Sequence, residues 1–305
     1  MTSTAFSATS TWTRRHLVDA YSLTVEEILA VMAEAKALEG IKLPLLAGKV
    51  MANLFYENST RTRTSFELAA KYLSAEVVNL DIATSSVQKG ENLVDTVETL
   101  AAMGVDALVI RHPSSGVCQQ LVSHFKNRVS IINAGDGMHE HPSQGLLDLY
   151  TMLEKLQTVA GKKIVIVGDI LHSRVARSNL HILTKLGAQV HLVGPPSLLP
   201  PHIPHIPLDE ALKDADVVMG LRLQLERQAS GLIPSLAEYR ELYGINSQRL
   251  ELAKPGVLVM HPGPMNRGIE ITSDVADTSL IQQQVRNGVI VRMAILKLLL
   301  QETGR

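Results

Sequence analysis

Apolar positions along this chain follow two alternating patterns. Short continuous apolar runs, typical of strands buried on both faces, occur at 49–56, 76–81, 106–112, 129–134, 162–168, 188–194, 214–220 and 256–263. Segments whose apolar residues recur three and four positions apart predict helices at 24–39, 59–73, 91–103, 117–125, 143–156, 174–187 and 279–301. Strands that alternate with helices are typical of parallel sheets covered by helices.

The number of elements predicts two domains of the α/β class. Four of the strands precede the helix at 143–156 and four follow it, so we expect the two domains to join near this helix. A length of 305 residues suits two domains of ordinary size. The segment 195–207 contains six of the 13 prolines, which predicts an irregular surface loop.

Composition and charge exclude several classes of protein. With 46% hydrophobic and 19% charged residues, the chain is neither disordered nor a coiled coil. The 29 Lys and Arg residues balance 30 Asp and Glu residues, so no overall field attracts nucleic acid or an anionic membrane. The single cysteine, Cys118, excludes an intrachain disulfide and a multi-cysteine metal site. No apolar run is long enough to span a membrane, and we expect a cytoplasmic protein.

The segment 55–67 carries the strongest candidate site. It reads FYENSTRTRTSFE and passes from a predicted buried strand into a predicted helix. Ligands of open α/β sheets bind at such junctions, and the free N–H groups of a first helical turn favour an anion. Ser59, Thr60 and Thr62 would add hydroxyl groups and Arg61 a guanidinium, which predicts a phosphate site. The alternative is a capped helix with exposed arginines.

Two further segments of the first half place polar residues at similar junctions. His141 and Gln144 lie three positions apart at a predicted helix start, where both can contact a planar polar group such as a carbamoyl. The alternative is a helix cap beside an ordinary polar histidine. Arg111 ends the strand at 106–112 and would project toward the same edge of the sheet, or else form a surface ion pair. The loop at 85–96, which contains Lys89, by itself resembles a solvated turn.

The second half has cationic residues after its own strands. Arg174 begins the helix that follows the strand at 162–168, while Arg222 and Gln224 follow the strand at 214–220. Two separated arginines suit a ligand with two carboxylates, because guanidinium binds carboxylate in a bidentate manner. The segment 261–271, HPGPMNRGIEI, is a Pro- and Gly-rich loop that can bring backbone carbonyls close to a ligand.

These motifs together resemble a known enzyme family. STRTRTSFE, HPSQ at 141–144 and HPGP at 261–264, in this order, are similar to segments of the aspartate and ornithine carbamoyltransferases, over essentially the whole chain. Ornithine-specific members typically carry HPCQ and a cysteine-containing HCLP loop, so the resemblance favours the aspartate-specific branch. It implies transfer of the carbamoyl group of carbamoyl phosphate to the amine of L-aspartate, the committed step of pyrimidine (UMP) synthesis. The alternatives are a carbamoyltransferase for another amino acid, such as ornithine, and a non-catalytic paralogue that binds anions or serves in assembly.

The resemblance also implies roles for the residues at matching positions. The residues expected to hold the phosphate are Ser59, Thr60, Arg61 and Thr62. The residues expected around the carbamoyl group are Thr62, Arg111, His141, Gln144 and the backbone of Gly263 and Pro264. The residues expected to bind L-aspartate are Lys89, Arg174, Arg222 and Gln224. The catalytic set would be Arg61, Thr62, Arg111 and His141.

Assembly and domain boundaries follow from the same resemblance. Ser85 and Lys89 would come from a neighbouring subunit, which implies a homotrimer with shared active sites. A carbamoyl phosphate domain at 1–145, completed by a C-terminal helix at 279–305, would be joined by long interdomain helices to an aspartate domain at 146–278. Neither a cofactor nor a metal is expected, because the leaving phosphate can accept the amine proton. Regulatory chains or a dihydroorotase are further partners that the family allows.

Overall fold

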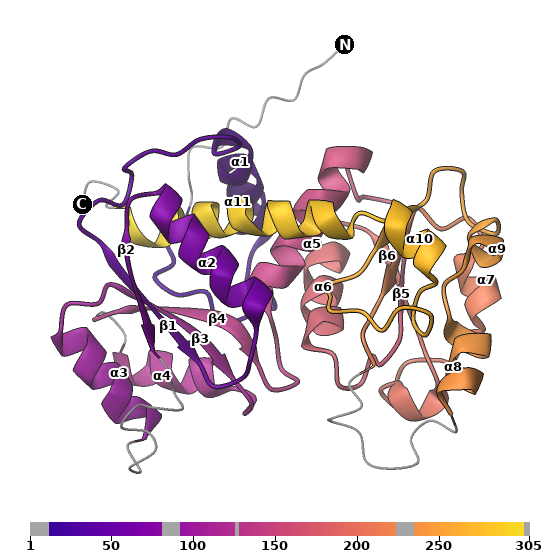
Figure 1. Cartoon of the computed structure of the whole chain (residues 1–305), viewed down its shortest axis with the longest axis horizontal. Helices are drawn as coiled ribbons and strands as arrows, with labels where there is room; N and C mark the ends of the chain where they lie inside the picture. Colours follow the sequence, from indigo (N-terminus) through magenta and orange to yellow (C-terminus); the bar gives the residue numbers. More distant parts are fainter. Residues whose placement is uncertain (1–11, 81–91, 126–127, 224–234, 302–305) are drawn as a thin grey trace. The chain divides into compact units, whose positions relative to one another are not determined.

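The computed structural model describes residues 12–80, 92–125, 128–223 and 235–301. The chain forms two compact units, one of Met1–Leu146 with Asn287–Arg305 and one of Leu147–Arg286 (Figure 1). The division falls within two helices, α5 (Pro142–Leu156) and α11 (Ile281–Leu300). The functional domains expected at 1–145 with 279–305 and at 146–278 stay a prediction.

Each unit contains one parallel sheet of four strands. The first sheet has the order β2-β1-β3-β4, and its strands are β1 (Val50–Phe55), β2 (Glu76–Leu80), β3 (Ala107–His112) and β4 (Ser130–Asp136). The second has the order β6-β5-β7-β8, and its strands are β5 (Lys163–Val167), β6 (Gln189–Val193), β7 (Val217–Gly220) and β8 (Leu258–Met260). The chain order reverses between β1 and β3 and again between β5 and β7, which is where α/β sheets bind ligands. The expected α/β class is confirmed.

Helices cover both faces of the first sheet. Figure 1 shows α3 (Leu93–Ala102) and α4 (Val117–Phe125) on one side of it and α2 (Thr60–Tyr72) on the other. Side chains of alternate strand residues, such as Leu54, Leu108 and Ile110, form a buried cluster with α3 and α4. On the other face Phe66 of α2 is fully buried, and the guanidinium carbon of Arg292 in α11 lies 5.0 Å from the centre of its ring. The predicted near-continuous apolar strands therefore have the two-sided burial that their pattern requires.

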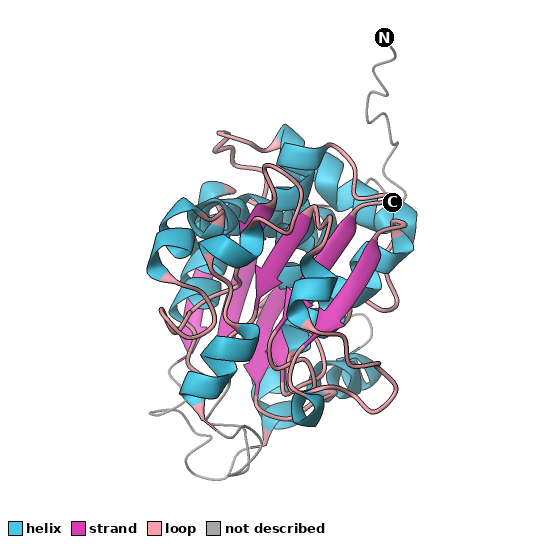
Figure 2. Ribbon diagram, turned by 90° about the vertical axis from the view of Figure 1, so that its right-hand side faces the viewer, coloured by secondary structure: helices cyan, strands magenta, loops and turns pink. Residues whose placement is uncertain are grey.

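The second unit has the same layered construction. Val165, Val167, Val218 and Val259 on one face of its sheet form a core with α7 (Leu208–Leu212), α8 (Leu236–Tyr243) and α10 (Ser273–Thr278). Ile164 and Ile166 of β5 alternate with these valines and are fully buried on the opposite face of the sheet. Figure 2 shows the strands enclosed between helices. The helix α6 (Arg174–Lys185) packs against β6.

A matching aspartate ties the amino ends of the strands in each sheet. Asp106, before β3, accepts a hydrogen bond from the backbone N–H of Val50 at 2.9 Å. Asp216, before β7, accepts one from the backbone N–H of Lys163 at 2.9 Å and bonds Nζ of Lys254 at 2.9 Å. These hydrogen bonds lie at the amino ends of the strands, whereas the predicted sites lie at the carboxyl ends. They therefore stabilise each sheet at the end that carries no predicted site.

Several elements differ from the sequence prediction. The short helices α7, α8, α9 (Ser247–Leu250) and α10 span too few residues for a clear helical period, and they were not predicted. β7 begins at Val217 rather than 214, because Asp214 adopts a positive φ of 57° and Asp216 is turned toward Lys163. The loop 195–207 is irregular except for one 3-10 turn, Pro196–Leu198, and it is anchored by buried Leu198 and Leu199. Among the described residues, no helix has the length and apolar character needed to cross a membrane.

Candidate active site

The segment that connects β1 to α2 presents a capped helix start. Ser59 adopts an extended conformation as the N-cap of α2, and its Oγ accepts a hydrogen bond from the backbone N–H of Thr62 at 3.3 Å. Thr62 is buried, and its carbonyl accepts a hydrogen bond from Oγ of Ser65 at 3.0 Å. No acidic residue occupies the first turn of α2. The positive end of the helix is therefore not neutralised from within its own first turn, which suits an anionic ligand.

Thr60 and Arg61 lie on the open side of the same helical turn. Both residues are exposed, in contrast to Thr62 one position further on. Partial desolvation lowers the pKa of the Arg61 guanidinium from its ordinary value, yet an arginine remains a cation at neutral pH. The turn thus offers a hydroxyl and a charged planar donor beside the N–H groups of the helix.

Arg111 lies at the carboxyl end of β3, next to the end of β1. The register of the sheet pairs it with Phe55, and Nε of Arg111 lies 3.4 Å from Oε2 of Glu57. On the other side, the pairing of β3 with β4 shifts between Ile110 and His112, so β4 contains one extra residue opposite Arg111. A bulge of this kind redirects neighbouring groups. Here the carbonyl of Ala134 accepts a hydrogen bond from Nη1 of Arg111 at 3.4 Å.

His141 and Gln144 lie where β4 connects to α5. His141 directly precedes α5, and its carbonyl accepts a hydrogen bond from the backbone N–H of Gln144 at 2.9 Å. Both residues are buried, and Oγ of Ser143 lies 3.4 Å from Nδ1 of His141. The phosphate-binding candidates thus follow β1, Arg111 lies at the carboxyl end of β3, and His141 and Gln144 follow β4. These are three adjacent strands of one sheet.

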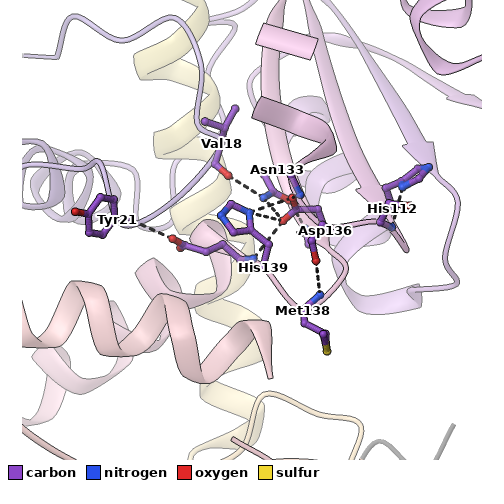
Figure 3. A network of polar contacts seen from close by, with 12 residues as sticks. Val18, Tyr21, His112, Asn133, Asp136, Met138 and His139 are labelled. Atoms are coloured by element: carbon purple, nitrogen blue, oxygen red, sulfur yellow. Dashed lines mark hydrogen bonds and ion pairs between the residues drawn. The ribbon is translucent and has the colours of Figure 1, made fainter. Parts of the chain in front are cut away.

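A buried polar network supports the loop that leads to His141. Figure 3 shows Asp136 at its centre, between Asn133 and His139. Asp136 accepts hydrogen bonds from Nδ2 of Asn133 at 2.7 Å and from the backbone N–H of Gly116 at 2.7 Å, and Nδ1 of His139 lies 3.1 Å away. Asp136 is fully buried, so these contacts replace the water that its carboxyl group lost on folding.

The N-terminal segment extends this network to the residue before His141. The carboxylate of Glu140 accepts hydrogen bonds from the backbone N–H groups of Ala20 at 2.7 Å and Tyr21 at 3.2 Å. Leu17 forms a parallel bridge with Ile132, so the same segment covers the free edge of β4. Sequence reasoning missed Asp136 and Glu140. Both lie between the strand predicted at 129–134 and the helix predicted at 143–156, in a segment for which the sequence predicts no element.

In the second unit, Arg174 is the first residue of α6. Ser173 caps this helix, its Oγ accepting a hydrogen bond from the backbone N–H of Ala176 at 3.1 Å, and Arg174 is buried. Just before the cap, Oδ1 of Asp169 lies 2.8 Å from Nδ1 of His172. Gly168 allows the close approach of β5 to β7, because a Cβ atom there would lie 2.9 Å from Cβ of Leu221.

Arg222 and the 263–264 dipeptide follow the ends of the next two strands. Arg222 is half-buried and lies two residues after β7, and Gly263 and Pro264 follow β8 and are joined by a cis peptide bond. Nδ1 of His261 accepts a hydrogen bond from the backbone N–H of Gly263 at 2.9 Å. Arg174, Arg222 and this dipeptide thus follow the carboxyl ends of β5, β7 and β8. Ser85, Lys89 and Gln224 lie outside the described residues.

Comparisons with known proteins agree with this division of the residues. The carbamoyl-P binding domain of aspartate/ornithine carbamoyltransferase matches residues 15–154, and the Asp/Orn binding domain matches residues 160–299. The chain belongs to the aspartate/ornithine carbamoyltransferase family. In this family's terms, Ser59–Thr62, Arg111, His141 and Gln144 lie in the carbamoyl-P binding match, while Arg174, Arg222, Gly263 and Pro264 lie in the Asp/Orn binding match.

Individual carbamoyltransferases support the assignment. The aspartate carbamoyltransferase catalytic subunit of Desulfitobacterium hafniense is 55% identical over 303 residues, which covers 95% of this chain and 96% of that one. Aspartate transcarbamoylase from Trypanosoma cruzi, solved with carbamoyl aspartate and phosphate, is 32% identical with a TM-score of 0.86 and covers 95% of this chain and 98% of its own. Ornithine carbamoyltransferase from Pyrococcus furiosus is 30% identical with a TM-score of 0.84 and covers 94% and 97%. The two structures fit almost equally well, so backbone shape does not separate the two substrate classes.

Proposed function

We propose that this protein transfers the carbamoyl group of carbamoyl phosphate to the amine of L-aspartate, which gives N-carbamoyl-L-aspartate and phosphate. The observation that carries this proposal is the 55% identity, over 95% of the chain, to a protein named aspartate carbamoyltransferase catalytic subunit. Structures with carbamoyl phosphate and aspartate bound are known for the Trypanosoma cruzi relative, which is 32% identical. The reaction is the committed step of de novo pyrimidine synthesis.

The start of α2 binds the phosphate group of the first substrate. Ser59, Thr60 and Thr62 supply hydroxyl or backbone N–H groups, and Arg61 supplies a positive charge on the exposed side of the turn. A dianionic phosphate gains from both the helix N-terminus and the guanidinium. No glycine-rich loop is required, because the N–H groups of a helix start and a guanidinium can bind a phosphate without one.

The neighbouring strand ends act on the carbamoyl group. Attack of the amine on the carbamoyl carbon places negative charge on the carbonyl oxygen, and fixed donors at this oxygen lower the barrier. Arg111, His141 and Thr62 are the donors in this proposal, and Gln144 with the backbone of Gly263 and Pro264 orients the carbamoyl nitrogen. The bulge opposite Arg111 and the network around Asp136 fix two of these elements before any substrate binds.

The cationic residues of the second unit select the acceptor amino acid. Arg174 and Arg222 bind the two carboxylates of L-aspartate, with Gln224 and Lys89 assisting. Ornithine carries an ammonium group in place of the second carboxylate, and a guanidinium would repel it. This difference in charge favours aspartate over ornithine even though the backbone suits both.

The carbamoyl transfer needs no nucleophile from the protein. The neutral amine of aspartate forms a C–N bond to the carbamoyl carbon, and the C–O bond to phosphate breaks as the tetrahedral intermediate collapses. The proton of the amine moves to the departing phosphate. Binding of both substrates by one enzyme removes much of the entropic cost of a bimolecular reaction.

Assembly is part of the proposal. Ser85 and Lys89 reach the site of a neighbouring copy, so the active unit is a homotrimer with shared sites, and the enzyme works in the cytoplasm. Regulatory chains or a dihydroorotase extend this trimer if the protein has such partners. Measurement of the protein's mass in solution, alone and with candidate partners, tests the trimer and these partners.

A phosphate-release assay tests the proposed reaction. The purified protein is supplied with carbamoyl phosphate and either L-aspartate or L-ornithine, and the organic product is identified by mass. We expect phosphate release and N-carbamoyl-L-aspartate with aspartate only. Activity with ornithine alone would establish the alternative substrate, and the absence of turnover with any amine would favour a non-catalytic anion-binding protein.

A further inference from the structure

A run of buried side-chain hydrogen bonds connects three helices within the second unit. Asp148 of α5 is fully buried, and its Oδ2 accepts a hydrogen bond from Nδ2 of Asn179 in α6 at 2.8 Å. Its Oδ1 accepts one from Nε2 of Gln284 in α11 at 2.8 Å. Asn179 and Gln284 are buried as well, so the loss of either bond would leave polar groups without the water that could replace it.

The run continues from Gln284 to the end of β8. Oε1 of Gln284 accepts a hydrogen bond from the backbone N–H of His261 at 3.0 Å. Nδ1 of His261 in turn accepts one from the backbone N–H of Gly263 at 2.9 Å. The buried ring of His261 lies beside Gly220 of β7, where a Cβ atom would be 3.2 Å from Cδ2 of the ring. Asp148 is thus connected, through two side chains, to the backbone at Gly263.

The chemistry of the groups sets the direction of these bonds. An ionised carboxylate only accepts and a backbone N–H only donates. Gln284 must therefore donate with its amide nitrogen to Asp148 and accept with its amide oxygen from His261. A glutamine supplies both roles in one group, whereas a glutamate has no donor for Asp148 and a methionine has neither a donor nor a strong acceptor.

The backbone of Gln284 is attached to the strand that leads to His261. Its N–H donates to the carbonyl of Leu280 at 2.8 Å, and the N–H of Leu280 donates to the carbonyl of Val259 in β8 at 2.8 Å. The start of α11 is therefore joined to β8 by its backbone and, two residues further along the strand, by the side chain of Gln284. The side chain can thus hold residue 261 from a fixed base.

We propose that Asp148 and Gln284 are positioning residues for the carbamoyl group of the substrate. Through His261 they hold the 263–264 backbone, which orients the carbamoyl nitrogen. The role rests on the proposed function, since it assumes that this backbone contacts carbamoyl phosphate. A misplacement of about an ångström near reacting groups can cost about 10²-fold in rate. The two side chains act through the loop after β8 and do not themselves contact the substrate.

The test has a matched control on the same two helices. Gln283 directly precedes Gln284, and its Nε2 donates to Oε2 of Glu154 in α5 at 2.7 Å at an exposed position. Gln284→Met and Gln283→Met keep the length of the side chain and remove the same kind of bond from the buried and the exposed position. We expect Gln284→Met to lower kcat by about tenfold or more, because the carbamoyl nitrogen is no longer held in line. Gln283→Met should keep the wild-type kcat.

The Kd for inorganic phosphate separates positioning from a general loss of structure. In the proposed site the first unit binds the phosphate, whereas the 263–264 backbone contacts only the carbamoyl group. The Kd for phosphate should therefore change less than about threefold in Gln284→Met while kcat falls. A rise in this Kd that matches the fall in kcat would make the effect one of general stability and would overturn the proposal.

A second set of variants moves the charge along the run and keeps its hydrogen bonds. Gln284→Glu and Asp148→Asn each break the run, because each leaves two donors or two acceptors facing one another. In the double variant Asp148→Asn/Gln284→Glu, the new amide accepts from Asn179 and donates to the new carboxylate, which still accepts from the N–H of His261. We expect about a tenfold lower kcat in each single variant and a return to within about threefold of the wild type in the double variant.

Three outcomes contradict the positioning role. The first is a wild-type kcat in a folded Gln284 variant, and the second is an equal loss of kcat in Gln283→Met. The third is a folded double variant whose kcat stays as low as that of the single variants. This comparison decides the question if Gln284→Met does not fold.

The wild-type protein separates this inference from the proposed function. If the wild type does not carbamoylate L-aspartate, the proposed function fails. Hydrogen exchange then still reports on the loop, because the amides of His261 and Gly263 should exchange faster in Gln284→Met than in Gln283→Met whether or not the protein is active. If the wild type is active and the Gln284 variants keep its kcat, only the positioning role fails.

Discussion

Nε of Arg111 lies 3.4 Å from Oε2 of Glu57, so the cation at the end of β3 faces a carboxylate from the segment after β1. An anionic ligand must compete with this carboxylate for the guanidinium. The two side chains are mostly buried, where charges interact more strongly than in water. The pair therefore sets how strongly the site attracts an anion.

Substitutions of the two partners are expected to have opposite effects on phosphate binding. Glu57→Gln removes the competing charge and keeps the shape, so inorganic phosphate should bind a few-fold more tightly. Arg111→Ala should weaken phosphate binding and lower kcat by about 10²–10³-fold, because it removes a donor to the carbonyl oxygen. Calorimetric titration with phosphate gives the first result and steady-state kinetics the second. Changes of the same sign in both variants would contradict the competition.

Arg61→Ala should damage the use of carbamoyl phosphate. In the proposed site its guanidinium supplies a charge to the phosphate at the start of α2, so we expect kcat/KM for carbamoyl phosphate to fall by at least about 10²-fold. Lys71→Ala is the matched control on the same helix. Lys71 forms an exposed ion pair with Glu67 at 2.6 Å, which contributes at most about 0.5 kcal/mol. Near-normal kinetics of Arg61→Ala would refute the phosphate assignment.

Ser59→Ala should affect both stability and substrate binding. Loss of the cap on α2 costs about 1 kcal/mol in the free energy of unfolding, and the first turn loses the geometry that receives the phosphate. Thr24→Ala removes a comparable cap from α1 (Val25–Ala37), where Thr24 and Glu27 form the capping box that the sequence predicts. Both variants should unfold at lower urea concentrations, and only Ser59→Ala should raise the KM for carbamoyl phosphate. An equal rise in both would make the effect structural.

Sharing of sites between subunits predicts complementation. Neither Arg61→Ala nor Lys89→Ala forms a complete site, but a trimer that contains both chains has sites at which both native residues are present. Unfolding and refolding the two inactive variants together should therefore recover part of the wild-type activity. Native mass spectrometry confirms that mixed trimers form. Mixed trimers without recovered activity would place Lys89 in the site of its own chain or outside any site.

Asp216 predicts how stability depends on pH. Burial by itself raises the pKa of this carboxyl group, but hydrogen bonds from Lys254 and the backbone of Lys163, with the charges of Lys254 and Lys162, hold the pKa below its ordinary value of 3.8. The unfolded chain therefore binds this proton more readily, and the stabilisation is complete well above pH 3.8 and is lost as the pH falls through the lower native pKa. Asp216→Asn should be about 1.5–3 kcal/mol less stable than the wild type at pH 7. Urea unfolding from pH 7 to pH 3 should show this difference shrinking only at the acidic end.

Much of the fold could be predicted from the sequence because the signals are local. Runs such as 162–168 must be buried on both faces, and that condition by itself favours a strand in a covered parallel sheet. The capping box at Thr24 and the exact extent of α4 also depend only on neighbouring residues. Candidate residues such as Ser59, Arg111 and Arg174 were found because they lie at the ends of predicted strands or at the starts of predicted helices.

Residues that act through distant partners could not be found in this way. Asp148 bonds Nε2 of Gln284, which is 136 positions away, and Glu140 bonds the N–H of Ala20, 120 positions away. No local pattern distinguishes these carboxylates from the many acidic residues on the surface. The bulge opposite Arg111 depends on how two strands pair, which neither strand specifies alone.

The sequence by itself determined the alternation of strands and helices, the α/β class and the motifs that we propose bind a phosphate and a dicarboxylate. Each of these depends on the side chains of one short segment and its backbone. Tertiary structure decided which carboxylates are buried, that Arg111 faces Glu57 and that Gln284 joins Asp148 to the loop after β8. Those relationships exist only after strands far apart in the chain have paired, because burial and sheet register are properties of the folded chain.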